Sequence, residues 1–121
     1  MYTIGIDVGG TNLKAGLVDE NYRIVATSKM PLVWQSQEKL VSDLAALAED
    51  AAAQGGVPKG EIASIGIGFP GAVNRKEGAV IQTVNIPIRE MPVAALLRQH
   101  WDVPIFLGND ADCAALGEFY H

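Results

Sequence analysis

A strict alternation of apolar with small or polar residues at the start of the chain constrains its fold more than any other feature. In residues 2–8 every second side chain is apolar, and a period of two is typical of a β-strand with one buried face. The apolar side chains of this run are Tyr2, Ile4, Ile6 and Val8. Leu13, Ala15 and Leu17 repeat the pattern, and it returns in residues 22–30. Short turns separate the three runs, so we expect an antiparallel meander of three strands.

After the meander, the pattern predicts helices and strands in alternation. Apolar residues after Ser36 recur at the spacing of a helix, and Gly55-Gly56 marks its end. The later elements are a strand over residues 64–69, a hairpin over 73–81, a helix from Pro92 to about His100, a strand over 105–107 and a helix over 110–120. The order β-β-β-α-β-α-β-α, with a small hairpin after the fourth strand, predicts an α/β domain. We expect a mixed five-stranded sheet with helices on its faces.

The composition fits one domain and excludes several classes of protein. With 121 residues, 49% of them hydrophobic, the chain is long enough for one core and too apolar to be disordered. Its formal net charge of −5 argues against a broad surface for nucleic acid or anionic lipid. One cysteine, Cys113, excludes an internal disulfide, and no apolar run reaches the length of a transmembrane helix. We therefore expect a cytoplasmic protein without a membrane partner.

The loop between the first two strands contains residue types that are typical of a phosphate-binding loop. Its sequence is Asp7-Val8-Gly9-Gly10-Thr11-Asn12-Leu13-Lys14. The two glycines allow positive φ angles and let backbone NH groups approach a ligand. Thr11 adds a hydroxyl, Lys14 a cation, and Asp7 a carboxylate that suits Mg²⁺ held through water. A tight hairpin, in which Asp7 only accepts hydrogen bonds from the turn, explains the same residues equally well.

The fourth strand ends in a glycine-rich turn, Gly66-Ile67-Gly68-Phe69-Pro70-Gly71, that matches the dinucleotide-binding pattern G-x-G-x-x-G. That pattern requires a helix to begin directly after it, so that the helix N-terminus faces a pyrophosphate. Residues 73–78 are instead typical of a hairpin, which excludes the dinucleotide interpretation. What remains is a glycine-rich strand and a sharp turn beside a candidate ligand site.

The last strand leads into Asn109-Asp110-Ala111-Asp112, where a helix is expected to begin. Asp110 can act as a simple N-cap of that helix. A carboxylate kept ionised by the helix dipole, next to an amide, also suits accepting a proton from a substrate hydroxyl. Asp112 would point away from Asp110 on a helix, so the two do not form a paired-carboxylate site.

Together these loops resemble the ROK family of sugar kinases and sugar-responsive repressors, which is part of the hexokinase–actin superfamily. The matching stretches are residues 4–12 (IGIDVGGTN), 65–71 (IGIGFPG), 85–87 (NIP) and 109–118 (NDADCAALGE), in the order the family has them. Each stretch is weak alone, whereas four in register across nearly the whole chain are a specific signal. The resemblance implies a ribonuclease H-like domain, as in actin-like ATPases.

The resemblance also implies a role for residues in each loop. The phosphate-binding residues would be Asp7, Gly9, Gly10, Thr11, Asn12 and Lys14, for ATP whose Mg²⁺ contacts Asp7 through water. The sugar-binding residues would be Pro70, Gly71, Asn85, Asn109 and Asp110. Asp110 would be the catalytic base for the sugar hydroxyl that attacks the γ-phosphate. Where family members commonly have Asn-Asp-Ala-Asn, this chain has Asp112 in the last place.

The length of the chain departs from the family, whose members have two domains and more than twice as many residues. We therefore expect residues 1–121 to be a single N-terminal domain, expressed as a fragment. The second domain, with the rest of the ATP site and the family's zinc motif, would lie outside this chain. Loss of the partner domain would expose apolar surface, and we expect a homo-oligomer.

The functional prediction is the N-terminal half of an ATP-dependent sugar kinase that phosphorylates a hexose or an N-acyl-hexosamine. One alternative is a sugar-responsive transcriptional regulator of the same family, although the acidic charge argues against nucleic-acid binding by this chain. The other alternative is a non-catalytic sugar-binding domain.

Overall fold

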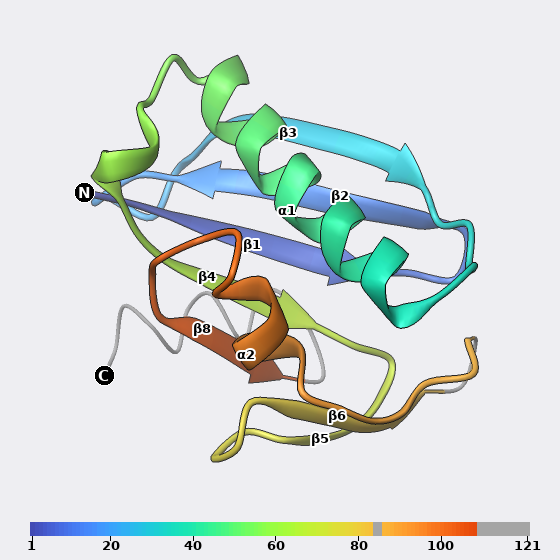
Figure 1. Cartoon of the computed structure of the whole chain (residues 1–121). Helices are drawn as coiled ribbons and strands as arrows, with labels where there is room; N and C mark the ends of the chain where they lie inside the picture. The colour runs from blue at the N-terminus through green and yellow to red at the C-terminus, as the bar shows by residue number, and fades with distance from the viewer. Residues whose placement is uncertain (84–85, 109–121) are drawn as a thin grey trace.

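The computed structural model describes residues 1–83 and 86–108 (Figure 1). Its elements are β1 (Tyr2–Val8), β2 (Asn12–Val18), β3 (Ile24–Pro31), α1 (Gln37–Gln54), a 3-10 turn η1 (Lys59–Glu61), β4 (Ile62–Gly68), β5 (Gly71–Asn74), β6 (Ala79–Thr83), β7 (Arg89–Met91), α2 (Val93–Leu97) and β8 (Ile105–Gly108). The predicted helix over residues 110–120 lies outside the described residues.

Five strands form one mixed sheet in the order β3-β2-β1-β4-β8. β1 pairs antiparallel with β2, and β2 pairs antiparallel with β3, which confirms the predicted meander. β1 also pairs parallel with β4, and β4 pairs parallel with β8. The predicted α/β fold with a mixed five-stranded sheet is therefore confirmed, with β1 at its centre.

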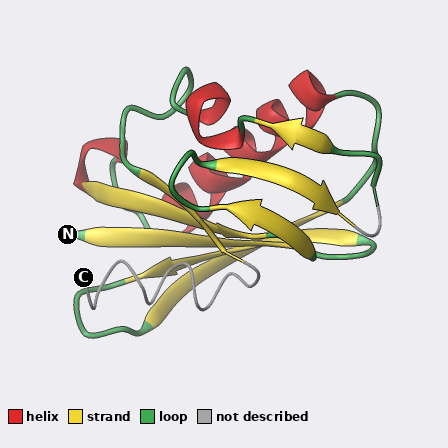
Figure 2. Ribbon diagram, turned by 90° about the horizontal axis from the view of Figure 1, so that it is seen from below, coloured by secondary structure: helices red, strands yellow, loops and turns green. Residues whose placement is uncertain are grey.

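The hydrophobic core lies between the sheet and the two helices. The alternating apolar residues of the strands, such as Ile4, Ile6, Leu17 and Ile65, are completely buried. Helix α1 packs on β1, β2 and β3, while α2 packs on β8, on β6 and on α1. Both helices therefore cover the same face of the sheet, as Figures 1 and 2 show. The residues that alternate with the core residues face the other side.

Helix α1 begins and ends where the sequence predicts. The Ser36 hydroxyl accepts a hydrogen bond from the backbone NH of Lys39 (3.1 Å), and Gly55 caps the other end. Gly56 has a φ of +66°, a conformation that favours glycine. The helix buries its apolar stripe against the sheet. Within residues 1–83 and 86–108, no helix has the length and apolarity required to cross a membrane.

Several predicted boundaries are wrong by two or three residues, and two of these have a clear physical reason. The third strand begins at Ile24 and not at residue 22, because Tyr22 has a φ of +64° in a turn. Asp19 holds this turn, since its Oδ1 accepts hydrogen bonds from the backbone NH groups of Asn21 and Arg23 (2.8 and 3.0 Å). The second helix ends at Leu97 and not near His100. There the chain turns, and the Trp101 side chain is completely buried, with its indole NH donating to the Ala45 carbonyl (3.1 Å).

The predicted hairpin is confirmed, but it is part of a three-stranded sheet in the order β5-β6-β7. β5 and β6 pair antiparallel around a turn in which Gly78 has a φ of +68°. The third strand, β7, pairs with β6 and was not predicted. It has three residues, too few to show an alternating pattern, and one of them, Glu90, has a φ of +50°.

Candidate active-site edge

Three parallel strands end at one edge of the main sheet, and the diglycine bend and the Pro70-Gly71 turn leave from there. In the register of the sheet, Asp7 on β1 is opposite Gly68 on β4, and Gly68 is opposite Gly108 on β8. The diglycine bend follows β1 directly, and the Pro70-Gly71 turn follows β4. The carboxyl ends of parallel strands are the usual place for ligand sites in α/β sheets. Asn85, Asn109 and Asp110 lie outside the described residues; the end of β8 that precedes Asp110 lies at this edge.

The diglycine bend is a closed turn with an exposed tip. The backbone NH of Gly9 donates to the Asn12 carbonyl (2.9 Å), and the Thr11 carbonyl accepts from the NH of Leu32 (2.9 Å). A Cβ added at Gly9 would lie 3.0 Å from the Asn12 carbonyl oxygen, whereas one added at Gly10 would meet open space. The Asn12 side-chain amide donates to the Thr11 hydroxyl (3.0 Å).

The prediction that these glycines provide positive φ angles is wrong. The described glycines with positive φ are Gly56 and Gly78, so neither Gly9 nor Gly10 has one. A glycine is instead favoured at position 9 because a Cβ there would lie close to the Asn12 carbonyl oxygen. Gly10 has open space around the position that a Cβ would take.

Charged residues form a row across the sheet next to this bend. In the register, Lys29 on β3 is opposite Lys14 on β2, and Lys14 is opposite Asp7 on β1. Residues directly opposite have their Cβ atoms about 4.5–5.5 Å apart. All three side chains are exposed, and they alternate with core residues, so they face away from α1. Among the described residues, none of these three side chains forms an ion pair or hydrogen bond with a partner.

Lys29 was missed in the sequence analysis. Its place beside Lys14 depends on the β2–β3 register, which the sequence pattern alone does not specify. Two like charges directly opposite each other weaken a sheet slightly unless a counter-charge lies nearby. Asp7 supplies one negative charge, and the row as a whole remains positive.

The Pro70-Gly71 turn is packed tightly against β6. The NH of Phe69 donates to the Gly108 carbonyl (2.9 Å), which ties the end of β4 to the end of β8. Gly71 pairs with Thr83 in the small sheet, and a Cβ added to it would lie only 2.1 Å from the Gln82 carbonyl oxygen. β5 begins at Gly71, so no helix follows the glycine-rich turn. The prediction that a hairpin, and not a helix, follows this turn is confirmed.

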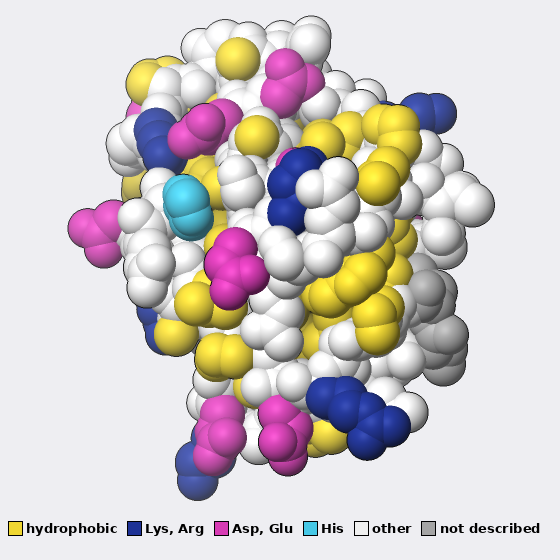
Figure 3. Space-filling model, turned by 45° about the vertical axis from the view of Figure 1, so that its right-hand side comes forward, with side chains coloured by type: hydrophobic (Ala, Val, Ile, Leu, Met, Phe, Trp, Pro, Cys, Tyr) yellow, Lys and Arg dark blue, Asp and Glu magenta, His cyan; other side chains and the backbone are white. Residues whose placement is uncertain are grey.

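A pocket of about 390 Å³ lies beside this turn. Its lining residues are Gln37, Gln82, Thr83, Ile86, Pro87, Ile88 and Arg89. Its lining residues include Thr83 and Ile86, which lie shortly before and just after Asn85 in the sequence. The space-filling view brings this side of the molecule forward and shows a continuous group of apolar side chains there, with separate Lys and Arg side chains around it (Figure 3).

The donor set at this edge fits Mg²⁺ bound together with a phosphate ligand. Asp7 is an exposed carboxylate at a strand end, without a partner in the described part of the chain. Mg²⁺ keeps several waters and binds through one or two carboxylates plus substrate phosphates. Residues 1–83 and 86–108 contain no group of three or more His, Cys, Asp or Glu that could hold a metal alone.

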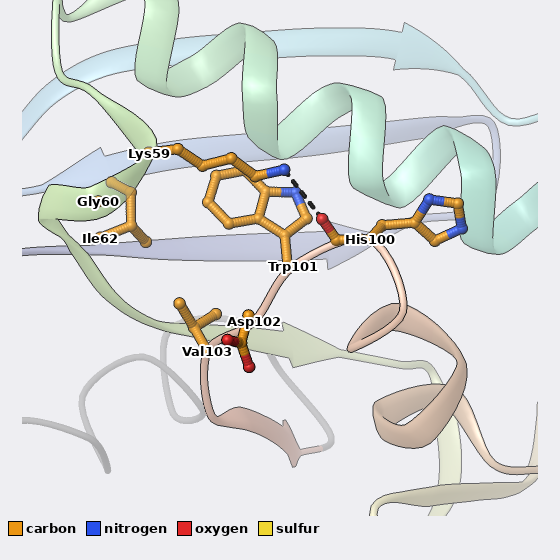
Figure 4. A pocket seen from close by; sticks show the side chains of 7 residues that line it. All are labelled: Lys59, Gly60, Ile62, His100, Trp101, Asp102 and Val103. Carbon is orange, nitrogen blue, oxygen red and sulfur yellow. Dashed lines mark hydrogen bonds between the residues drawn. The ribbon is translucent and has the colours of Figure 1, made fainter.

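A second pocket, of about 360 Å³, lies at the other ends of the same strands (Figure 4). Two of its polar side chains, Lys59 and Trp101, have partners within the protein. The Lys59 ammonium donates to Glu49 and to the His100 carbonyl (2.9 Å each) and lies 4.4 Å from the centre of the Trp101 ring. These contacts hold η1 and the segment before β8 to α1.

The comparison with protein families matches residues 3–121 to the ROK family. A glucokinase of Streptomyces coelicolor is 37% identical over 117 residues, which is 97% of this chain and 35% of the relative. An N-acetyl-D-glucosamine kinase of Yersinia pseudotuberculosis is 34% identical over 115 residues (94% and 36%). A putative xylose repressor of a Caldicellulosiruptor species is 28% identical over 116 residues (95% and 29%). The chain spans about a third of the length of these relatives.

Among solved structures, a ROK family glucokinase from Streptomyces griseus, in complex with glucose and AMPPNP, has the same fold. The TM-score is 0.82 at 34% identity, and the match covers 98% of this chain and 36% of that protein. The likeness confirms the predicted fold class.

Proposed function

This chain belongs to the ROK family, and we propose that it is the N-terminal domain of an ATP-dependent sugar kinase. The substrate class is a hexose or an N-acyl-hexosamine, in line with the glucokinase and N-acetyl-D-glucosamine kinase among its relatives. The observation that carries the proposal is the register of β1, β4 and β8, which ends all three strands at one edge. A phosphate loop and a sugar hydroxyl must meet at such an edge for phosphoryl transfer.

The diglycine bend and the row of charged residues suit the phosphates of ATP. Gly10 and Thr11 are exposed at the tip, and Lys14 adds a positive charge opposite Asp7. Mg²⁺, bound with ATP and held by Asp7 through water, would neutralise phosphate charge. In phosphoryl transfer, the protein mainly positions groups and stabilises charge. Binding by backbone NH groups and Lys14 does both.

We assign the sugar side of the reaction to three other segments of the chain. Pro70 and Gly71 lie at the edge, and we assign Asn85 and Asn109 to hydrogen bonds with sugar hydroxyls and Asp110 to the reacting hydroxyl. The sugar oxygen forms a bond to the γ-phosphorus while the bond between that phosphorus and the β–γ bridging oxygen breaks, and ADP leaves. A sugar hydroxyl has a very high pKa, so Asp110 first orients it and takes its proton late in the transfer.

The test is ADP release by the full-length protein that contains this domain, in the presence of Mg²⁺, ATP and one sugar at a time. We expect sugar-dependent turnover with glucose or an N-acyl-hexosamine. Because loss of a general base costs about 10²–10⁴ in rate, Asp110→Ala lowers kcat at least that far and leaves nucleotide affinity unchanged. Absence of sugar-dependent ADP release with every hexose and N-acyl-hexosamine would overturn the proposal.

The isolated 121 residues should not phosphorylate sugar, because half of the ATP site would lie on a second domain. The relationship to a putative xylose repressor keeps a regulatory function as the second candidate. That function predicts a full-length protein that binds sugar without turnover and changes its affinity for DNA when sugar is added.

A further inference from the structure

We propose that Lys29 is a second lysine that contacts the phosphates of ATP, an inference that rests on the proposed kinase function. Lys29 lies on β3, and its side chain is exposed. In the register of the sheet it is directly opposite Lys14 on β2, the lysine assigned above to the phosphates. Two neighbouring strands thus present one ammonium group each, side by side, next to the diglycine bend.

The neighbours of Lys29 on β3 fix the direction of its side chain. The Ser28 hydroxyl donates a hydrogen bond to the carboxylate of Asp50 on α1, and Met30 packs against the hydrophobic core. Side chains alternate along a strand, so Lys29 extends from the face of the sheet opposite α1. Lys14 extends from the same face, because cross-strand partners share a face.

A backbone hydrogen bond ties this part of β3 to the diglycine bend. The NH of Leu32 donates to the Thr11 carbonyl (2.9 Å), directly after the end of β3. Lys29 lies three residues before Leu32, which is about 10 Å along a strand. A lysine has a long, flexible stem, so its ammonium group can meet a phosphate of ATP bound at the bend without any movement of the backbone.

The charges around Lys29 favour an anion at this place. Lys39 and Lys59 form ion pairs with carboxylates (2.7 and 2.9 Å). Lys14 and Lys29 form no ion pair among the residues that the structure describes, and like charges directly opposite each other destabilise a sheet. Asp7, opposite Lys14, offsets one of the two charges. The other is left for a ligand, and a phosphate of ATP supplies the missing negative charge.

The experiment uses the full-length protein and AMPPNP with Mg²⁺. Lys29→Met removes the charge and keeps an unbranched apolar side chain, whereas Lys29→Arg keeps the charge. Lys76→Met makes the same change at an exposed lysine in the turn between β5 and β6. The measurements are the Kd for Mg–AMPPNP by calorimetry at low and high salt, the Kd for glucose and for N-acetyl-D-glucosamine without nucleotide, and the free energy of unfolding without ligand.

We expect Lys29→Met to weaken Mg–AMPPNP binding about five-fold at low salt, as for loss of an exposed charge contact. The effect should be smaller at high salt, which screens exposed charges. Lys29→Arg and Lys76→Met bind Mg–AMPPNP like the wild type, and sugar affinity is unchanged in all three variants. Because Lys29→Met removes a like-charge pair, its free energy of unfolding should not fall below that of the wild type.

Wild-type affinity for Mg–AMPPNP in Lys29→Met, or an equal loss in Lys76→Met, overturns this inference alone. Equal losses in Lys29→Arg and Lys29→Met also overturn it, since the charge would then not be the cause. A lower free energy of unfolding with unchanged nucleotide affinity would show that Lys29 pairs with another segment of the protein instead. A wild-type protein that does not bind Mg–AMPPNP overturns the proposed function as well.

Discussion

The two edges of the main sheet differ in how they use their polar groups. At the edge where β4 and β8 begin, Lys59 makes two hydrogen bonds and covers the ring of Trp101, which is itself hydrogen-bonded to α1. At the edge where β1, β4 and β8 end, Asp7 and Lys14 are exposed and have no partner among the described residues. We call the first edge sealed, in the sense that Lys59 and Trp101 are paired there, and the second edge open, because Asp7 and Lys14 are unpaired among the described residues.

This difference separates stability from function. Polar groups that satisfy one another contribute to folding, whereas charged groups without partners are available to a ligand. Variants at the sealed edge should change the free energy of unfolding and leave ligand binding alone. Variants at the open edge should do the reverse.

The largest effect is expected at the sealed edge. Trp101 is completely buried, and replacing a buried Trp by Ala costs about 3–5 kcal/mol. We expect Trp101→Ala to lower the free energy of unfolding of this chain by that amount in urea titrations. A loss below about 1 kcal/mol would show that Trp101 does not anchor the segment before β8.

Asp7→Asn is the corresponding change at the open edge. Because Asp7 is exposed and unpaired within the described part of the chain, the free energy of unfolding should stay within about 0.5 kcal/mol of the wild type. Loss of one group that stabilises transition-state charge typically costs about 10²–10³ in kcat, and we expect a loss of that size in the full-length protein if it is the proposed kinase. Wild-type kcat in this variant would remove Asp7 from the site.

The smallest effects come from a matched pair of lysines. Lys14→Met removes the positive charge that we propose to contact a phosphate, and should weaken ATP binding about ten-fold without a change in stability. Lys59→Met removes a cation–π contact and an exposed ion pair, and should cost about 1 kcal/mol of stability without a change in ATP affinity. Equal behaviour of the two variants in both assays would contradict the distinction between the edges.

The sequence predicted the elements better than the contacts between them. The alternation of apolar and polar residues identified β1 and the meander, and Ser36 and Gly55-Gly56 identified the start and the end of α1. These signals are local in the sequence. The predicted start of β3 was wrong because the Asp19 turn gives Tyr22 a positive φ. The predicted end of α2 was wrong because the burial of Trp101 depends on contacts that no short pattern reveals. β7 was missed because three residues carry no period.

In the candidate site, too, the sequence predicted residues within local motifs better than residues whose place depends on contacts between elements. The motifs placed Asp7, Lys14 and the Pro70-Gly71 turn at strand ends, and parallel pairing puts those ends together. Lys29 was missed, since its place beside Lys14 depends on register. The roles of Asn85, Asn109 and Asp110 stay predictions from the resemblance.

The most direct test of the account is a crystal structure of the full-length protein with sugar and AMPPNP. We predict the phosphates against the backbone NH groups of Gly10 and Thr11 and near Lys14, with the Asp110 carboxylate hydrogen-bonded to a sugar hydroxyl that faces the γ-phosphate. Phosphates bound at the Lys59–Trp101 edge, or an Asp110 carboxylate directed away from the diglycine bend, would contradict the account.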